Sequence, residues 1–358
     1  ILNMLEFIGI IRMNYINKFQ NQLLNWYRQK ARELPWRSDP SPYKVWISEA
    51  MLQQTRVETV IPYFNRFVDE IPSVESLAEV EDERLFKLWQ GLGYYRRATY
   101  LKKAAQAIVK EYNGHLPVSI NELKSLPGIG AYTAGAIASI AFNIPVPAVD
   151  GNVLRVMARV NADQGNIRNP EVKKRIEELV ITLIPTNNAG DFNQALMDLG
   201  AGICLPNGTP KCNECPVKEF CKAYSKGLVS TIPVKSDKKE RKMLEKTILT
   251  VWWNGRMAIR KRESKGLLAN LWELPNYEGF LSKEQCVLIL EQLGFTVTDI
   301  TTMKNARHIF THIEWVMKGY SISVEGEGNL SDWKWVTDEE IRGIYSIPTA
   351  FQAFFPSS

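Results

Sequence analysis

The chain has 358 residues, 45% of them hydrophobic, so it exceeds one ordinary domain and can bury more than one core. Its formal net charge of +5 permits a polyanionic partner without requiring one. Four of the five cysteines lie within residues 204–221, which is typical of metal ligands in a reducing compartment rather than of a disulfide framework. Residues 1–11 are apolar but too short for a membrane span, and we expect a disordered or loosely packed extension there.

The N-terminal part of the chain has the pattern of helices. Residues 14–30 carry apolar side chains at helical spacing, and Leu34-Pro35-Trp36-Arg37 ends that helix. Residues 43–57 are predicted to form the next helix, which is apolar on nearly every side of Glu49 and is therefore expected to be buried. Burial raises the pKa of a carboxyl group, so Glu49 can serve as a general acid. The alternative is a helix glutamate that reaches solvent or an arginine partner.

A glycine turn interrupts the helical pattern of residues 85–98. Gly91-Leu92-Gly93 is predicted to form the turn, and Tyr94 is expected to begin the next helix. A flat aromatic ring at the tip of a turn can insert into a base stack. The more ordinary interpretation is that Tyr94 and Tyr95 are packed surface aromatics.

The most informative stretch is a predicted pair of helices joined by short turns. Leu126-Pro127-Gly128-Ile129-Gly130 is a turn that leaves backbone amides exposed at the start of an alanine-rich helix, which makes an anion site. Pro145 and Pro147 must end that helix, and Asp150 stands before a second one. Asp150 is either an ordinary N-cap or a carboxylate aimed at a ligand.

Three runs in this part of the chain resemble the helix-hairpin-helix DNA glycosylase superfamily, and within it the MutY family of adenine glycosylases. They are Leu-Pro-Gly-Ile-Gly-x-Tyr-Thr-Ala at 126–134, Val-Asp-Gly-Asn-Val-x-Arg-Val at 149–156 and Glu-x-Met-Leu-Gln-Gln-Thr at 49–55. The resemblance implies a hairpin that holds a DNA phosphate through Gly128 and Gly130.

The resemblance also implies roles for individual side chains. Glu49 would protonate the adenine, and Asp150 would stabilise the sugar as it gains oxocarbenium character. Tyr132 and Asn152 would orient Asp150 and the sugar. Gln194 could pair with an adenine edge, although it could equally be a surface polar residue. The implied contacts to DNA or to the base are Arg37, Gln54, Tyr94 and Gln194.

Tyr132 bears on the type of reaction. Bifunctional relatives have a lysine at this point of the hairpin, and its amine attacks the sugar. A phenol cannot form a Schiff base, so the resemblance implies a monofunctional enzyme that uses water and leaves an abasic site. The rival is a bifunctional glycosylase–lyase, and Tyr132 would then be only a packing residue at the start of the helix.

The cysteine cluster predicts a metal site. Cys204, Cys212, Cys215 and Cys221 suit either zinc or a [4Fe-4S] cluster on spacing alone. The Cys-x-x-Cys-Pro-x4-Cys ending resembles the cluster loop of the glycosylase superfamily, which favours a structural [4Fe-4S] cluster. The first gap is seven residues here, whereas the family usually has six. The loop would present Lys211, Lys218 and Lys222 to phosphate.

The composition changes after this loop. A charged run at 236–242 places an interdomain linker at 227–244, and strand-like runs flank an Asn254-Gly255 hairpin turn beyond it. This part resembles the Nudix-type C-terminal domain of the MutY family. It has Glu284 and Glu291 but no Arg-Glu-x-x-Glu-Glu run, so we expect a binding module without a hydrolase metal.

The run Phe310-Thr311-His312 resembles the Phe-Ser-His motif with which the family reads 8-oxoguanine. Thr311 keeps the hydroxyl group and could hydrogen-bond to the lesion, with His312 in support. The alternative is that residues 307–312, which alternate like a strand, have no special role.

The sequence therefore predicts a multidomain protein. Residues 14–226 form an all-α helix-hairpin-helix glycosylase domain with an iron–sulfur loop, and residues 245–358 form an α+β Nudix-like domain. The expected function is removal of adenine mispaired with 8-oxoguanine or guanine in duplex DNA, by a cytoplasmic monomer with no membrane partner. Two further rivals are a non-catalytic zinc DNA-binding module and a small-molecule Nudix hydrolase.

Overall fold

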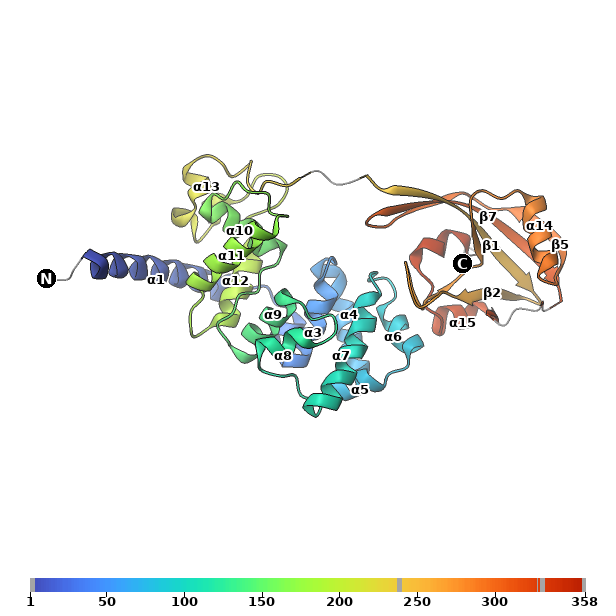
Figure 1. Ribbon diagram of the computed structural model, residues 1–358, viewed down its shortest axis with the longest axis horizontal. Coiled ribbons are helices and arrows are strands. Elements are labelled where there is room, and N and C mark those ends of the chain that lie inside the picture. The colour runs from blue at the N-terminus through green and yellow to red at the C-terminus, as the bar shows by residue number, and fades with distance from the viewer. Residues whose placement is uncertain (1–3, 237–239, 327, 329–331, 356–358) are drawn as a thin grey trace. The chain divides into compact units, whose positions relative to one another are not determined.

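The computed structural model describes residues 4–236, 240–326, 328 and 332–355, with side chains from Met13 onward. The chain divides into two compact units, Ile1–Glu79 with Tyr100–Asp237, and Val80–Thr99 with Lys238–Ser358. Figure 1 shows that helices dominate the first unit and that a sheet forms the centre of the second. The predicted first domain, 14–226, includes residues 80–99, which in the structure group with the second unit.

The first unit is all-α. Its longer elements are α1 (Met4–Lys30), α3 (Pro42–Leu52), α4 (Val57–Glu70), α7 (Arg96–Tyr112, which begins in the second unit), α9 (Ala131–Phe142), α10 (Gly151–Asn161), α11 (Pro170–Leu183) and α12 (Ala189–Gly202). The shorter ones are α2 (Pro35–Ser38), α5 (Val74–Glu79), α8 (Ile120–Ser125), η1 (Cys212–Glu214), η2 (Lys218–Phe220) and α13 (Lys222–Ser225).

Three predicted helix boundaries were wrong. Helix α1 begins at Met4, so the expected loose extension is helical from that residue. Helix α3 ends at Leu52 and not at 57, because Gln54 takes a left-handed backbone conformation (φ 60°) that a helix cannot contain. Tyr94 is likewise left-handed (φ 48°) and belongs to the turn before α7, which starts at Arg96.

Close helix packing surrounds the start of α10. A Cβ atom added to Gly135 in α9 would lie 2.1 Å from the Pro147 carbonyl oxygen. One added to Gly200 in α12 would lie 2.6 Å from the Cβ atom of Asn152. Only glycine permits these approaches, so α9 and α12 can pack directly against the backbone on either side of Asp150.

The second unit contains α6 (Asp82–Trp89) and a mixed sheet with strand order β3-β2-β1-β7-β5. Strands β1 and β7 are parallel, and the other pairs are antiparallel. The elements are β1 (Lys242–Trp253), β2 (Arg256–Lys261), β3 (Trp272–Glu273), β4 (Asn276–Glu278), α14 (Lys283–Gln292), β5 (Thr296–Thr302), β6 (Ala306–Ile309), β7 (Ile313–Glu325), β8 (Trp333–Val336), α15 (Asp338–Gly343) and η3 (Thr349–Phe354).

Each face of this sheet packs against its own core, and alternate side chains of β1 enter the two cores. Ile248 belongs to a core with Phe351 and Phe354 of η3, whereas Leu249 belongs to a core with Cys286 and Leu290 of α14. A sheet with helical segments on both faces is the α+β architecture that the sequence predicts.

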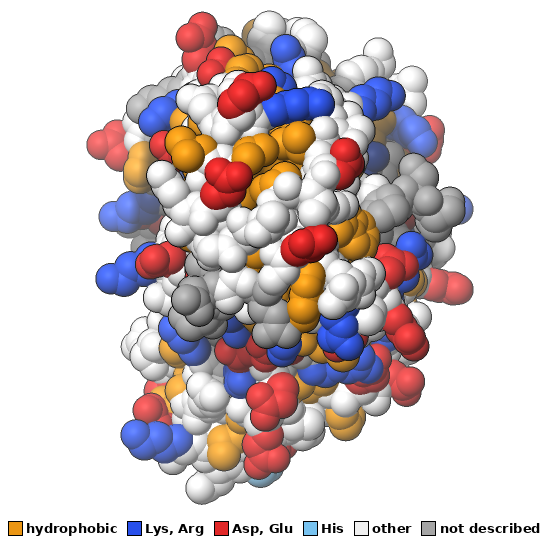
Figure 2. Space-filling view, turned by 90° about the vertical axis from the view of Figure 1, so that its right-hand side faces the viewer, with side chains coloured by type: hydrophobic (Ala, Val, Ile, Leu, Met, Phe, Trp, Pro, Cys, Tyr) orange, Lys and Arg blue, Asp and Glu red, His pale blue; other side chains and the backbone are white. Residues whose placement is uncertain are grey.

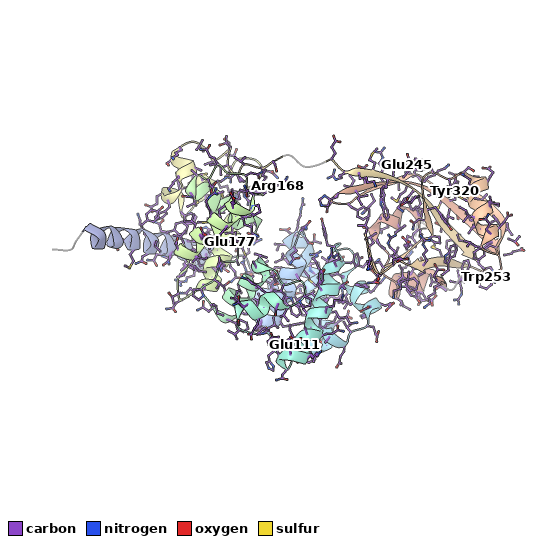
Figure 3. All side chains as sticks on the ribbon, in the orientation of Figure 1. Glu111, Arg168, Glu177, Glu245, Trp253 and Tyr320 are labelled. Atoms are coloured by element: carbon purple, nitrogen blue, oxygen red, sulfur yellow. The ribbon has the colours of Figure 1, made fainter. Side chains whose placement is uncertain are left out.

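The segment predicted as the linker, 227–244, is shorter in the structure. Ile232 is buried in the core of the first unit, and Val234 forms a β-bridge with Asn166. Arg168, which Figure 3 labels, donates from Nη1 to the Ser236 carbonyl oxygen at 3.0 Å. Strand β1 begins at Lys242, and residues 237–239 lie outside the described part of the chain. None of the helices in that described part has the length and apolar character needed to cross a bilayer.

Candidate active site

One cavity of about 420 Å³ in the first unit brings the predicted catalytic residues together. Its volume lies in the range of pockets that hold small ligands. Its lining comes from α2 and the segment before it, α3 and the turn after it, both ends of α9, the start of α10, and α12. Seven of the predicted site residues line it: Arg37, Glu49, Gln54, Tyr132, Asp150, Asn152 and Gln194.

Glu49 is the buried acid of this cavity. Its residue exposure is 4%, and burial together with the nearby Asp150 carboxylate raises the pKa of Glu49 to about 7. A hydrogen bond from Tyr132 and the charge of Arg37 oppose that rise. Near neutral pH this carboxyl group can therefore donate a proton, as the apolar sequence around it predicts.

Tyr132 contacts the buried acid directly. Its hydroxyl group donates to Glu49 Oε2 at 2.5 Å, and the role in orienting Asp150 and the sugar that the resemblance implies for it stays a prediction. Tyr132 is the second residue of α9, and its ring reaches across to α3. Burial and the charges of the two carboxyl groups raise the pKa of Tyr132 well above its ordinary value, so its phenol stays protonated.

Asp150 is both the N-cap of α10 and a wall of the cavity. Its Oδ1 atom accepts from the Asn152 backbone N–H at 2.9 Å and from the Val153 backbone N–H at 2.7 Å. The side chain of Asn152 donates to Oδ2 at 2.9 Å, so it lies where a residue that orients Asp150 would lie. Burial raises the pKa of Asp150, and these donors oppose the rise because they favour its carboxylate form.

Arg155 holds the side chain of Asn152 in place through a hydrogen bond to its amide oxygen. Its Nη2 atom donates to Asn152 Oδ1 at 3.0 Å and to the Gly200 carbonyl oxygen at 2.7 Å. Its Nε atom donates to the Cys204 carbonyl oxygen at 2.8 Å. Arg155 belongs to the run at 149–156, but the sequence predicts no role for it, because spacing does not show which way a helix residue points.

Asp198 and Arg32 are site residues that the sequence analysis missed. The Asp198 carboxylate, buried in α12, accepts from Arg37 Nη1 at 2.8 Å and from Arg32 Nη2 at 2.5 Å. Arg32 lines the cavity beside Arg37. These arginines lower the pKa of Asp198 despite its burial. Asp198 is the one polar residue in the run 195–202 of α12, and that is the signal that could have indicated this ion cluster.

The hairpin turn precedes α9 as predicted. Gly128 has a positive φ of 78°, and a Cβ atom there would lie 2.5 Å from the Cβ atom of Tyr100. Gly130 is the N-cap of α9 and has open space at its Cβ position. Neither glycine lines the cavity, so the phosphate contacts implied for them remain predictions.

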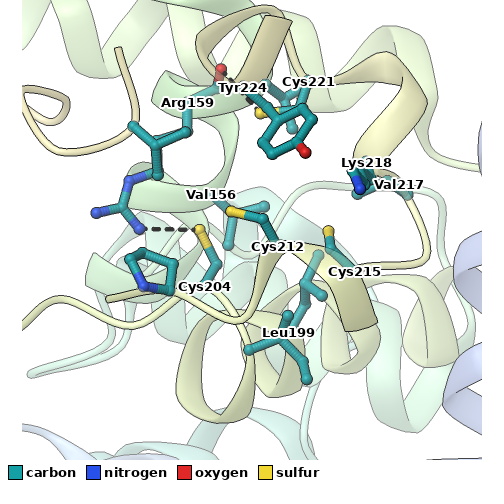
Figure 4. A pocket seen from close by; sticks show the side chains of 14 residues that line it. Val156, Arg159, Leu199, Cys204, Cys212, Cys215, Val217, Lys218, Cys221 and Tyr224 are labelled. Atoms are coloured by element: carbon teal, nitrogen blue, oxygen red, sulfur yellow. Dashed lines mark hydrogen bonds between the residues drawn. The ribbon is translucent and has the colours of Figure 1, made fainter. Parts of the chain in front are cut away.

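The four clustered cysteines line a second pocket in the first unit. Figure 4 shows the side chains of Cys204, Cys212, Cys215 and Cys221 around it, with Val156 and Leu199 among the apolar lining residues. Arg159 Nη1 donates to Cys204 Sγ at 3.1 Å. All four are free thiols, and among the described residues no three His, Cys, Asp or Glu side chains are grouped to hold a single metal ion.

The predicted lesion-reading residues form a turn and not a strand. Strand β6 ends at Ile309 and β7 begins at Ile313, so Phe310, Thr311 and His312 connect the two. The Phe310 ring packs edge-on against Trp315, with centroids 4.9 Å apart. Thr311 and His312 are exposed, and Thr311 Oγ1 lies 2.6 Å from Tyr94 Oη. The face shown in Figure 2 mixes acidic and basic side chains, in keeping with the modest net charge.

Two family models match the chain. Residues 47–181 match the HhH-GPD superfamily base excision DNA repair protein, and residues 247–356 match the NUDIX domain. An adenine DNA glycosylase of Rattus norvegicus is 34% identical over 402 residues, covering 95% of this chain and 78% of the relative. Another, from Buchnera aphidicola subsp. Baizongia pistaciae, is 34% identical over 336 residues, covering 91% of this chain and 93% of the relative.

A solved structure of a thermostable thymine-DNA glycosylase superimposes with a TM-score of 0.54 and 29% identity, covering 61% of this chain and 99% of that one. The two curated relatives match over both units, and the cavity holds a buried proton donor beside a second carboxyl group. The chain therefore belongs to the adenine DNA glycosylase family of base excision repair enzymes.

Proposed function

We propose that the protein hydrolyses the N-glycosidic bond of adenine mispaired with 8-oxoguanine, or with guanine, in duplex DNA. The observation that carries this proposal is the pairing of Glu49 and Asp150 in one cavity, where their environments differ. Glu49 is buried with a pKa of about 7, whereas Asp150 accepts three hydrogen bonds that favour its charged form. Two carboxyl groups separated in this way can divide the roles of acid and stabiliser.

The reaction begins when adenine leaves the base stack, which costs a few kcal/mol and is easier for a mispaired base. Glu49 gives its proton to the adenine ring, and the C1′–N9 bond breaks with its electron pair going to the base. Asp150 stabilises the oxocarbenium character of the sugar. Water then adds at C1′, and the proton that it releases restores Glu49.

We propose that the enzyme is monofunctional. Tyr132, at the position where bifunctional relatives have lysine, donates to Glu49 and offers no amine. The described residues that line the cavity include two arginines and no lysine. Treatment with borohydride during turnover should trap no covalent DNA adduct. A trapped adduct would show that an amine attacks the sugar.

Glu49→Gln tests the assignment of the acid. The amide keeps the size of the side chain but has no proton to give at neutral pH, so the variant should bind mispaired DNA and release adenine at least about a hundredfold more slowly. Single-turnover assays of alkali-sensitive sites measure the rate, with Glu70→Gln, on the exposed end of α4, as the matched control. A normal rate in Glu49→Gln would refute the assignment.

The lesion preference is proposed for the turn of Phe310, Thr311 and His312. Two exposed polar side chains beside a packed ring can contact the base opposite adenine. Duplexes with adenine opposite 8-oxoguanine, guanine or thymine should lose adenine in that order of rate, measured as alkali-sensitive sites. Equal rates for 8-oxoguanine and guanine would refute the preference.

We also propose that Cys204, Cys212, Cys215 and Cys221 hold a structural [4Fe-4S] cluster. Four free thiols in one mainly apolar pocket provide the donor set that such clusters use. Iron and sulfide analysis, with an ultraviolet–visible spectrum, should find about four of each per chain; stoichiometric zinc would contradict the proposal. We propose a cytoplasmic monomer, to be checked by sedimentation of the purified protein.

A further inference from the structure

Residues 80–99, here called the arm, belong to the second unit and contact the rest of that unit through several polar side chains. Glu83 forms an ion pair with Lys261 of β2 at 2.8 Å. Lys87 Nζ donates to the carbonyl oxygens of Ile341 at 3.0 Å and Tyr345 at 3.3 Å. Gln90 Nε2 donates to the carbonyl oxygen of Ile347 at 3.1 Å. The arm thus binds mainly to main-chain carbonyls of residues 341–347.

The segment that receives these bonds is itself firmly placed. Tyr345, Ser346 and Ile347 are all buried. The backbone N–H of Trp272 in β3 donates to the Ser346 carbonyl oxygen at 3.4 Å, and the Trp272 ring packs on Tyr345. Lys87 and Gln90 are therefore held by a segment that is attached to the sheet.

Immediately after Gln90 comes the turn that carries Tyr94. Gly93 and Tyr94 both have left-handed backbones, with φ of 70° and 48°. Arg97 Nη2 donates to the carbonyl oxygens of Leu92 and Gly93 at 3.0 Å, and Trp89 Nε1 donates to the latter at 3.1 Å. A tyrosine in this conformation persists only where its surroundings impose it, so the turn keeps one shape.

This turn presents Tyr94 to the turn of residues 310–312. The hydroxyl oxygens of Tyr94 and Thr311 lie 2.6 Å apart, and both residues are exposed. 8-Oxoguanine differs from guanine by an acceptor oxygen at C8 and a proton at N7. Two neighbouring hydroxyl groups can donate to the first and accept from the second.

We propose that Lys87 and Gln90 are positioning residues for lesion preference, because they hold Tyr94 beside Thr311. The inference rests on the proposed function, in which the 310–312 turn reads the base opposite adenine. The preference then has a source outside that turn, in a residue of α6 and the C-cap residue of α6, which bind carbonyl groups far along the chain.

The test uses the full chain with the double substitution Lys87→Met and Gln90→Met, which keeps side-chain bulk and removes the donors. The preference is measured as the single-turnover rate with 8-oxoguanine opposite adenine divided by the rate with guanine opposite adenine. In the double variant this ratio should fall about tenfold, which corresponds to about 1.4 kcal/mol of activation free energy. The single-turnover rate of the double variant with guanine opposite adenine should change by less than about twofold. Lys87→Arg, which keeps donors, should retain the ratio, as should Lys103→Met at an exposed site on α7.

Amide hydrogen exchange of residues 90–95 is the second measurement. It should become faster in the double variant and not in Lys103→Met. An unchanged rate ratio, or an equal fall in both rates, overturns the proposal. If the wild-type enzyme shows no preference, the proposed lesion reading fails, and the exchange data alone then decide whether Lys87 and Gln90 hold the Tyr94 turn.

Discussion

At the scale of single residues, the site depends on the different surroundings of two carboxyl groups, Glu49 and Asp150. Glu49 has one neutral donor, Tyr132, in an apolar helix, so its protonated form is favoured. Asp150 sits at a helix N-terminus with two backbone amides and an asparagine side chain directed at it. The helix N-terminus favours negative charge there. The two environments thus favour the protonated form of one carboxyl group, and the donors around the other favour its charged form.

Tyr132→Phe should shift the pH dependence of base release. Glu49 acts when protonated, so the single-turnover rate should fall as the pH rises through about 7. The Tyr132 hydrogen bond lowers the pKa of Glu49, so removing it should raise that pKa and move the fall to higher pH. A pH–rate profile of each protein checks this, with Tyr112→Phe on α7 as the control. A fall that moves to lower pH would contradict the hydrogen bond.

At the scale of elements, the contact of α10 with α12 keeps Asn152 in place. The Gly200 position lies against both the Cβ and the Cα atom of Asn152, and its carbonyl oxygen accepts from Arg155. Because there is no space between the two helices at this contact, a methyl group added at position 200 must displace one of them. The displaced residue would be the one that orients Asp150.

Gly200→Ala should therefore lower the single-turnover rate about tenfold or more and destabilise the first unit by roughly 1–3 kcal/mol. Gly202→Ala is the matched control in the same helix, because nothing lies within 4 Å of its Cβ position. That variant should keep its activity and be as stable as the wild type or slightly more so. Equal effects of the two substitutions in denaturation and rate measurements would refute the packing argument.

At the scale of the whole molecule, the two units have separate cores. Leu196 is fully buried in the core of the first unit, and Ile322 is fully buried in one core of the second. Each unit can then unfold with its own free energy. The arm shows that the units do not follow the order of the chain, because residues 80–99 cluster with a sheet that begins at Lys242.

Ile322→Ala should destabilise the second unit by about 2–5 kcal/mol and leave the first nearly unchanged. Leu196→Ala should destabilise the first unit by a similar amount and leave the second nearly unchanged. Native-state hydrogen exchange distinguishes them, since amides of β1 and β7 report on one unit and amides of α10 and α12 on the other. A uniform loss of protection over both units in either variant would show that they unfold together.

The sequence by itself determined the two kinds of fold, the two carboxyl groups of the site and the cysteine set. The kinds of fold follow from local rules, because glycine turns, apolar helices and alternating strands are recorded in neighbouring residues. The roles of the two carboxyl groups and of the cysteine set came from the family resemblance, since the residues alone left alternatives open. The burial of Glu49 could also be predicted, since its neighbours in α3 are apolar on nearly every side, and a helix of that kind is buried.

Only the tertiary structure decided which side chains meet. Tyr132 bonds to Glu49 from another helix, and Asp198 joins Arg32 and Arg37 from 161 or more residues away in the chain. The arm belongs with the second unit for the same reason. Contacts between distant parts of a chain depend on the relative placement of whole elements, and the spacing of residues within one element does not record that placement.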